Sequence, residues 1–221
     1  MRRKMYMLGI LFLVMIIGGG VYLLYQGVKG APDNPYKDLQ TTSVNKFLEE
    51  QDDYYVYAQR AGCPYCDNVR DEIIEFARNN QLYVLDTRAE GNEGIKDYNW
   101  DEHHKAYDKE IGKVVKGKMI LQDGLTEANL KERYSPLDYS IKKADKEFVE
   151  LNAGKEEGKI YAVRESPIID YTNVSDENLV IAAVPTLFHI KNGQIESYYF
   201  GDIQILNFLG VDKAPLDKYI N

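Results

Sequence analysis

Apolar residues at helical spacing and short, unbroken apolar or aromatic runs follow each other along the first half of the chain. Ser43 is a good N-cap for a short amphipathic helix, and the run Tyr54 to Ala58 is rich in aromatic and β-branched residues, as strands are. After Cys66 the apolar positions recur at helical spacing, and Leu82 to Asp86 predicts a second strand. Helix, strand, helix and strand in this order predict an α/β fold with a parallel strand pair and a right-handed crossover.

A second group of predicted elements lies near the C-terminus. Val184 to Ile190 and Ile195 to Phe200 are strand-like runs, and the connection between them contains Asn192-Gly193, the strongest short signal for a hairpin turn. These two strands should pair antiparallel. The apolar stretch Ile203 to Leu209 predicts a final helix that covers one face of the sheet.

The block between these two groups, residues 88–178, predicts an inserted and mostly helical subdomain. Helical spacing runs from Trp100 to Ile111, and two further helices are expected at Thr126 to Tyr134 and at Leu137 to Leu151. A single strand is expected at Lys113 to Leu121.

The N-terminus predicts a membrane anchor. Arg2, Arg3 and Lys4 precede the uncharged, mostly apolar run Met5 to Val28, which is long enough to span a bilayer once. The positive-inside rule places residues 1–4 in the cytoplasm and the domain that follows outside the cell membrane. Residues 29–42 read as a turn-rich linker. A cleaved signal peptide is the alternative, but no small-x-small site directly follows the apolar run, which favours an uncleaved signal anchor.

Charge restricts the partners of the extracytoplasmic part. The chain carries 27 basic and 35 acidic residues, with a net charge of −8, and three of the basic residues lie before the predicted membrane span. The remaining surface is therefore acidic, which argues against nucleic acid and anionic lipid as ligands.

The motif Cys63-Pro64-Tyr65-Cys66 contains the only cysteines of the chain and lies where a predicted strand gives way to a helix. Unpaired N–H groups and the positive dipole end of a helix favour a thiolate, so the first cysteine should ionise more readily than a free thiol. We expect Cys63, at the exposed helix start, to be the nucleophile. Cys66, one turn further in, should resolve a mixed disulfide.

Two other readings of the motif are weaker. A zinc site needs two further ligands, and the chain offers only His103, His104 and His189, so neither a metal nor another cofactor is expected. We expect His103 and His104 to be polar surface residues. A purely structural disulfide would close so short a loop that it would stabilise the fold little.

The CPYC motif at a helix start and Val184-Pro185-Thr186 opening a downstream hairpin together resemble the thioredoxin superfamily. The resemblance covers residues 43–87 and 179–221. It implies a three-layer fold with a central mixed sheet and flanking helices, and a cis Pro185 beside the dithiol. Two positions depart from thioredoxins proper, because Gly62 replaces a tryptophan and Tyr57 occupies the place of a buried aspartate.

The resemblance also suggests how substrates would bind. Pro64-Tyr65 is similar to the inner dipeptide of glutaredoxins, and Val184 before the proline resembles DsbA-like exported oxidases. An extended substrate peptide would then contact Pro64, Tyr65, Val184 and Pro185. The overall layout is similar to membrane-anchored thioredoxin-like proteins of Gram-positive bacteria.

The function expected from these features is that of an extracytoplasmic, membrane-anchored thiol–disulfide oxidoreductase. Its substrates would be the thiols or disulfides of exported proteins, and a membrane or exported redox partner would recycle the dithiol. The alternative is a non-catalytic assembly or scaffold component of an envelope secretion or conjugative transfer machine, in which the disulfide is structural.

Overall fold

The computed structural model describes residues 34–48 and 53–212, and it confirms a mixed α/β architecture with two β-sheets. All strands and helices described below belong to one compact unit, Tyr36–Asn221. The predicted cytoplasmic residues 1–4, the predicted membrane span 5–28 and the start of the linker lie outside the described residues. Within the described part, no helix has both the length and the apolar character that crossing a membrane requires.

The first sheet has five strands in the order β1-β3-β2-β8-β9. Its strands β1, β3 and β2 run parallel, whereas β2 pairs with β8, and β8 with β9, in antiparallel fashion. The parallel pair and the C-terminal hairpin predicted from sequence are thus confirmed. The strand bounds are β1 Gln40–Thr41, β2 Asp53–Gln59, β3 Leu82–Asp86, β8 Thr186–Lys191 and β9 Gln194–Phe200.

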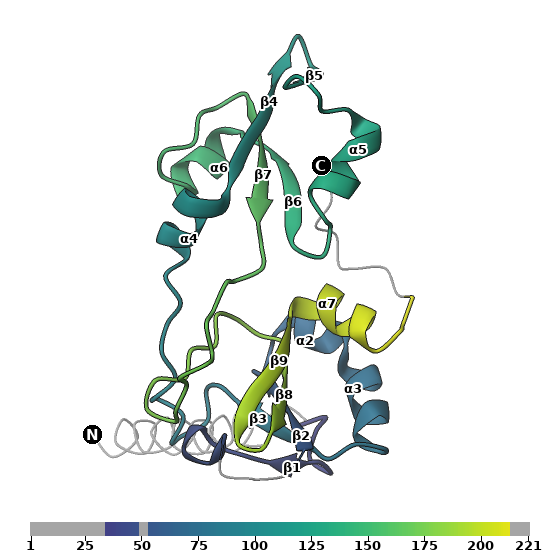
Figure 1. Cartoon of the computed structure of the whole chain (residues 1–221), viewed down its shortest axis with the longest axis vertical. Coiled ribbons are helices and arrows are strands. Elements are labelled where there is room, and N and C mark those ends of the chain that lie inside the picture. The colour runs from purple at the N-terminus through teal and green to yellow at the C-terminus, as the bar shows by residue number, and fades with distance from the viewer. Residues whose placement is uncertain (1–33, 49–52, 213–221) are drawn as a thin grey trace, which may run out of the picture. The chain divides into compact units, whose positions relative to one another are not determined.

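Three helices lie on one face of this sheet: α2 (Pro64–Asn68), α3 (Arg70–Ala77) and α7 (Gly201–Phe208) (Figure 1). The predicted helix after the dithiol is divided at Val69, whose ψ of 3° departs from helical geometry. The core beneath these helices is formed by side chains from both layers. Its fully buried members include Tyr57, Val69, Ile73, Leu187 and Ile205.

The opposite face of the sheet is covered mainly by irregular chain. The 3-10 helix η1 (Val44–Lys46) is the regular element in this layer. Around it, Leu179 and Ile181 are buried against the strands, and Tyr171 packs edge-on against Phe188 at 5.7 Å. Residues that were assigned to the insertion, among them Tyr171, therefore belong to the first core.

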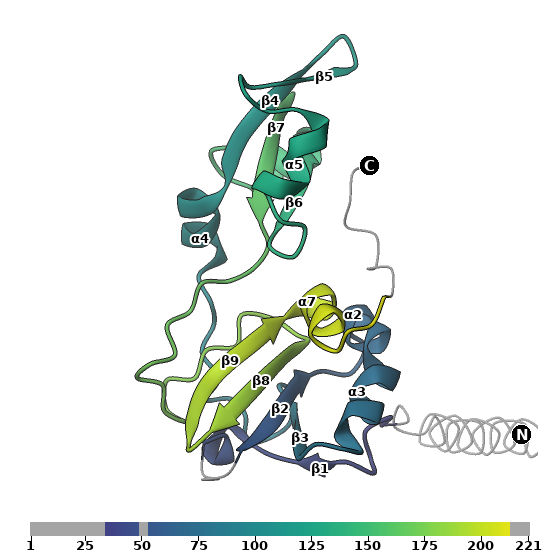
Figure 2. The same ribbon diagram turned by 45° about the vertical axis from the view of Figure 1, so that its right-hand side comes forward.

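The second sheet replaces the mostly helical insertion predicted from sequence. Four antiparallel strands in the order β5-β4-β7-β6 form it, and the short helices α4, α5 and α6 accompany it (Figures 1 and 2). It has its own apolar core around Ile111, Ile160 and Ala162. The bounds are α4 Trp100–Tyr107, β4 Lys109–Val115, β5 Lys118–Leu121, α5 Glu127–Arg133, β6 Tyr139–Lys143, α6 Lys146–Leu151 and β7 Lys159–Arg164.

The helical prediction failed where a helix and a strand follow each other without a glycine or proline between them. Leu137 to Leu151 contains the alternating strand β6 and then a new helix, for which Asp145 is the N-cap and accepts from the N–H of Phe148. The side chain of Asp145 therefore marks the boundary, because an N-cap has extended backbone geometry and ends the preceding element.

The chain enters and leaves the second sheet at neighbouring points. The hydroxyl oxygen of Tyr98 accepts a hydrogen bond from the N–H of Ile168 at 3.0 Å, and Lys96 forms a parallel bridge with Val180. The part that projects beyond the first sheet is thus bounded by Tyr98 and Ile168, and is shorter than the predicted block 88–178.

Candidate active site

Cys63 and Cys66 form a disulfide at the start of α2, with their Cα atoms 5.2 Å apart. Cys63 is the N-cap of the helix, with extended backbone angles, and Pro64 occupies the first helical position. The backbone N–H of Cys66 donates to the Sγ of Cys63 at 3.1 Å. A thiolate on Cys63 would therefore receive a hydrogen bond from the helix that would favour its charged form.

Both cysteines are buried, and the expected difference in exposure between them is absent. Cys63 and Cys66 are each 2% exposed, whereas Pro64 and Tyr65 between them are exposed, Tyr65 at 36%. The two sulfurs therefore differ by their hydrogen bonds and not by their access to solvent.

The Val184–Pro185 segment lies beside the dithiol, although 121 residues separate Val184 from Cys63. The peptide bond between Val184 and Pro185 is cis, and the carbonyl oxygen of Val184 is 3.6 Å from the Sγ of Cys63. Val184 is half-buried and Pro185 is buried, while the preceding Ala183 is exposed. The structure thus brings together Cys63, Cys66 and Val184, residues that the sequence analysis assigned to one site.

A pair of tyrosines lies behind the second cysteine. The hydroxyl of Tyr57 donates to the carbonyl oxygen of Cys66 at 3.4 Å, and the hydroxyl of Tyr36 lies 3.4 Å from that of Tyr57. Burial raises the pKa of Tyr57 far above its usual range, and burial also raises the pKa of Tyr36. Tyr57 therefore stays neutral and acts as a hydrogen-bond donor at this position.

Helix α7 contacts the dithiol helix through a buried carboxylate. Asp202 is 1% exposed, and its Oδ2 accepts a hydrogen bond from the side-chain amide of Asn68 at 2.9 Å. Its Oδ1 has no hydrogen-bond partner among the described residues. The pair joins the beginning of α7 to the end of α2.

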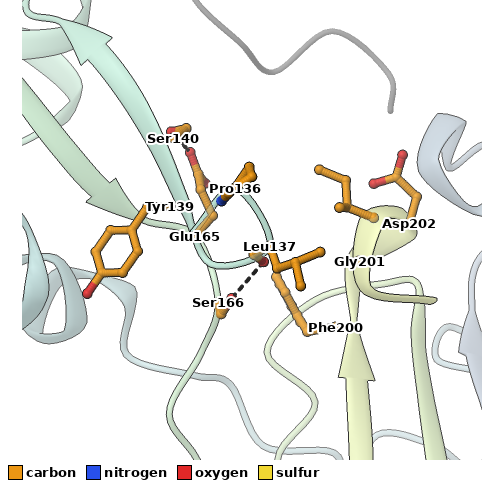
Figure 3. Close-up of a pocket in the computed structure, with 10 residues that line it drawn as sticks. Pro136, Leu137, Tyr139, Ser140, Glu165, Ser166, Phe200, Gly201 and Asp202 are labelled. Atoms are coloured by element: carbon orange, nitrogen blue, oxygen red, sulfur yellow. Dashed lines mark hydrogen bonds between the residues drawn. The ribbon is translucent and has the colours of Figure 1, made fainter. Parts of the chain in front are cut away.

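The turn before β6 lies beside the end of β9 and the beginning of α7, as Figure 3 shows for Leu137, Phe200 and Gly201. The side-chain amide of Gln204 donates to the hydroxyl of Ser166 at 2.9 Å and to the carbonyl oxygen of Leu137 at 3.2 Å. The space that remains between these segments is about 20 Å³, enough for a single water molecule. The second sheet is thus hydrogen-bonded to an element that flanks the dithiol helix.

Trp100 makes a second contact of this kind. Its indole N–H donates to the carbonyl oxygen of Ala182 at 3.1 Å, and its ring lies 5.9 Å from that of Phe200. Ala182 lies two residues before Val184, and Phe200 ends β9. The half-buried side chain of Trp100 therefore contacts the segment before β8 and the end of β9.

The two adjacent histidines are structural residues, and the expectation of surface positions is wrong for His103, which is 3% exposed. Its Nε2 lies 3.1 Å from the carbonyl oxygen of Arg164, so this nitrogen carries the proton, and its Nδ1 accepts from the hydroxyl of Tyr98 at 2.8 Å. Burial lowers the pKa of His103. Its neighbour His104 lies 3.2 Å from the carboxylate of Asp108.

No cluster of three or more histidine, cysteine or acidic side chains suited to a metal ion occurs in the described part of the chain. His189 instead contacts the carboxylates of Asp53 and Glu196 on the first sheet.

Sequence reasoning missed several residues of the site. Tyr36 and Asp202 reach the dithiol region from segments distant in the chain, whereas Asn68 lies in the dithiol helix itself and Gln204 bonds to Ser166; no motif marks any of them. One signal was present for Asp202: an acidic residue directly after Gly201, at the start of a helix that is otherwise mostly apolar.

Comparison with known proteins adds no assignment, because no protein-family model, curated protein or solved structure matches the chain.

Proposed function

We propose that the protein is a thiol–disulfide oxidoreductase of thioredoxin-like fold whose domain is anchored on the outer side of the cell membrane. The observation that carries the proposal is the environment of Cys63: it caps α2, accepts the N–H of Cys66 and lies beside the backbone of Val184. The strand order β1-β3-β2-β8-β9 and the position of Pro185 before β8 support the thioredoxin-like assignment.

The reaction uses the two sulfurs in turn. In the reductive direction the Cys63 thiolate attacks one sulfur of a substrate disulfide, the substrate S–S bond breaks, and the other substrate sulfur leaves as a thiolate that takes up a proton. Cys66, deprotonated, then attacks the Cys63 sulfur and releases the second substrate thiol. The protein ends oxidised by two electrons and the substrate reduced by two.

The opposite direction oxidises a substrate dithiol by the same steps in reverse order. Either direction needs a recycling partner that carries its own dithiol or disulfide. We propose that this partner is a membrane protein or an exported protein, and that the substrates are exported proteins. Backbone pairing with Val184, and contact with the exposed Pro64 and Tyr65, would hold an extended substrate peptide over the disulfide.

One observation favours a second candidate, in which the disulfide is a static clasp in an envelope assembly. Both cysteines are 2% exposed, as a structural disulfide would be. The reduction potential separates the two candidates, because structural disulfides lie below about −300 mV and working ones above this value. We expect the full-length protein in detergent to equilibrate with glutathione or dithiothreitol buffers above about −300 mV. A lower potential would favour the clasp.

The predicted topology has its own test. Protease added to intact cells, or to spheroplasts where an outer membrane is present, should digest the domain, and the intact chain should sediment with membranes. Protection from protease would contradict the orientation, whereas a mature N-terminus near Ala31 would show that the anchor is cleaved.

A further inference from the structure

We propose that Trp100 is a positioning residue of the dithiol site, whose indole N–H holds the segment that presents Val184 to Cys63. This inference deepens the proposed function and rests on it, since it gives the second sheet a part in peptide recognition at the same site.

Four consecutive carbonyl groups before β8 each have a defined neighbour. The oxygen of Ala183 accepts from the hydroxyl of Thr186 at 2.8 Å, and that of Pro185 accepts from the N–H of Gly201 at 2.9 Å. The oxygen of Val184 is 3.6 Å from the Sγ of Cys63. These three neighbours belong to the first sheet and its helices.

The fourth carbonyl, that of Ala182, has its hydrogen-bond partner in the part of the chain that contains the second sheet. Its partner is the indole N–H of Trp100 at 3.1 Å. Trp100 begins α4, and its place is fixed by Asn99, the N-cap, which accepts from the N–H of Glu102 at 3.1 Å. The indole N–H is the only hydrogen-bonding group of the Trp100 side chain, so a residue without this donor would leave the Ala182 carbonyl without its bond.

The ring of Trp100 also packs near the residue that precedes Gly201, which bonds to the end of the same segment, at Pro185. It packs at 5.9 Å from the ring of Phe200, the residue before the Gly201 that binds the Pro185 carbonyl. One side chain thus contacts both the segment that leads into Val184 and the residue that leads out of β9.

The position of the Val184 carbonyl has two chemical consequences. Its oxygen carries partial negative charge and lies beside the Sγ of Cys63, so it disfavours the thiolate and raises the pKa of Cys63. The N–H of Cys66 has the opposite effect, because it donates to the same sulfur and favours the thiolate. The same backbone would pair with an extended substrate. Loosening this segment should lower the pKa of the Cys63 thiol and weaken peptide binding.

The test compares Trp100→Phe with Tyr98→Phe in the full-length protein. Trp100→Phe removes the donor to Ala182 and keeps an aromatic ring against Phe200. Tyr98→Phe is the matched control, because it removes hydrogen bonds to His103 and Ile168 at the base of the second sheet and leaves Ala182 bonded. For each variant we would measure the pH dependence of Cys63 alkylation, and the KM and kcat for a disulfide-containing peptide and for hydroxyethyl disulfide.

We expect Trp100→Phe to raise KM for the peptide about two- to tenfold, the equivalent of one hydrogen bond, with KM for hydroxyethyl disulfide unchanged. The alkylation profile should shift to a lower pKa for Cys63. A variant with wild-type KM and an unshifted profile would overturn the proposal. So would equal shifts in Tyr98→Phe, since these would come from general loosening of the second sheet.

Two further measurements test the proposal if the wild type shows no turnover or if the variant does not fold. If the wild type turns over no disulfide, the proposed function fails, yet the alkylation profile still reports whether Trp100 sets the pKa of Cys63. If Trp100→Phe does not fold, the wild type supplies the answer, because Trp100 is the only tryptophan and gives one indole N–H resonance. Slow exchange of this proton supports the bond to Ala182, and exchange at the rate of a free indole refutes it.

Discussion

The backbone N–H of Cys66 donates to the Sγ of Cys63 at 3.1 Å. Because the two cysteines are equally buried, this bond and the helix start at Cys63 are what make the two sulfurs different. We expect Cys63 to have a pKa below the usual value of about 8.5 for a free thiol and to react first with limiting iodoacetamide at neutral pH. Peptide mapping would check this, and Cys66→Ser should retain a mixed disulfide that Cys63→Ser cannot form. First labelling of Cys66 would reverse the assigned roles.

Replacement of Tyr57 by Phe should lower stability without changing the pH dependence of thiol reactivity. The hydroxyl contacts the carbonyl oxygen of Cys66 and the hydroxyl of Tyr36, and its loss should cost about 1 kcal/mol. Burial raises the pKa of Tyr57, so the side chain is neutral and cannot serve as a base near neutral pH. Urea unfolding and the alkylation profile provide the two measurements. A displaced profile would show that Tyr57 takes part in proton transfer.

Acidification should destabilise the fold through His103. Burial lowers its pKa in the folded state below the ordinary 6.5, so the unfolded chain binds the proton more readily. The stability held by neutral His103 is complete above about pH 6.5 and declines as the pH falls toward the folded-state pKa. The hydrogen bonds that lower the pKa of Asp108 despite its burial act in a separate window, below about pH 3.8. Unfolding of His103→Gln between pH 7 and 5 should show a weaker pH dependence than the wild type, and equal slopes would contradict this account.

Gly112 has no room for a side chain. A Cβ there would lie 2.5 Å from the carbonyl oxygen of Ile120 and 3.0 Å from the Cα of Leu121, both backbone atoms of the paired strand. We expect Gly112→Ala to cost about 1–3 kcal/mol through displacement of β4 from β5. Gly94→Ala is the control, because its Cβ would meet only a side-chain atom of Val44 at 3.6 Å, and it should be tolerated. Equal melting temperatures of the two variants would argue against tight packing in this hairpin.

Excision of residues 99–166 should leave a folded domain. Tyr98 and Ile168 are hydrogen-bonded at 3.0 Å, so a short Gly/Ser linker can join the ends, and the cores around Phe188 and Ile73 keep their own residues. The truncated protein should still exchange disulfides with small model compounds and lose selectivity for peptides. Circular dichroism and a cooperative melt would establish folding. A folded truncation that no longer reacts with small disulfides would mean that the second sheet supplies catalytic groups.

The elements of the first sheet were predictable because their patterns are local. Aromatic and β-branched residues marked β2, the apolar run Leu82 to Leu85 marked β3, and Asn192-Gly193 marked the hairpin of β8 and β9, whose turn places Asn192 at a φ of 52°. The sequence could not reveal β1, which has two residues and exists through its pairing with β3. A strand so short carries no periodicity, and tertiary contacts alone define it.

The second sheet and the surroundings of the dithiol were less accessible to sequence reasoning. In β7 the four residues Ile160 to Val163 are all buried, which removes the alternation that identifies a half-buried strand. Likewise Asp202 and Trp100 acquire their contacts from Asn68 and Ala182, partners 134 and 82 residues away in the chain. Such pairings depend on the assembled fold, so no spacing within the chain predicts them.

The neighbouring positions of Tyr98 and Ile168 also bear on how this chain could have arisen. A segment inserted at that one point could bring a complete sheet with its own core around Ile111 and Ile160, leaving the strand order of the first sheet unchanged. Gain of the second sheet would then need a single event. Because the cores of the two sheets share no buried residue, each sheet could afterwards accept substitutions at its own rate. Substitutions at Trp100 and Gln204 would affect both sheets, because these side chains link the two parts.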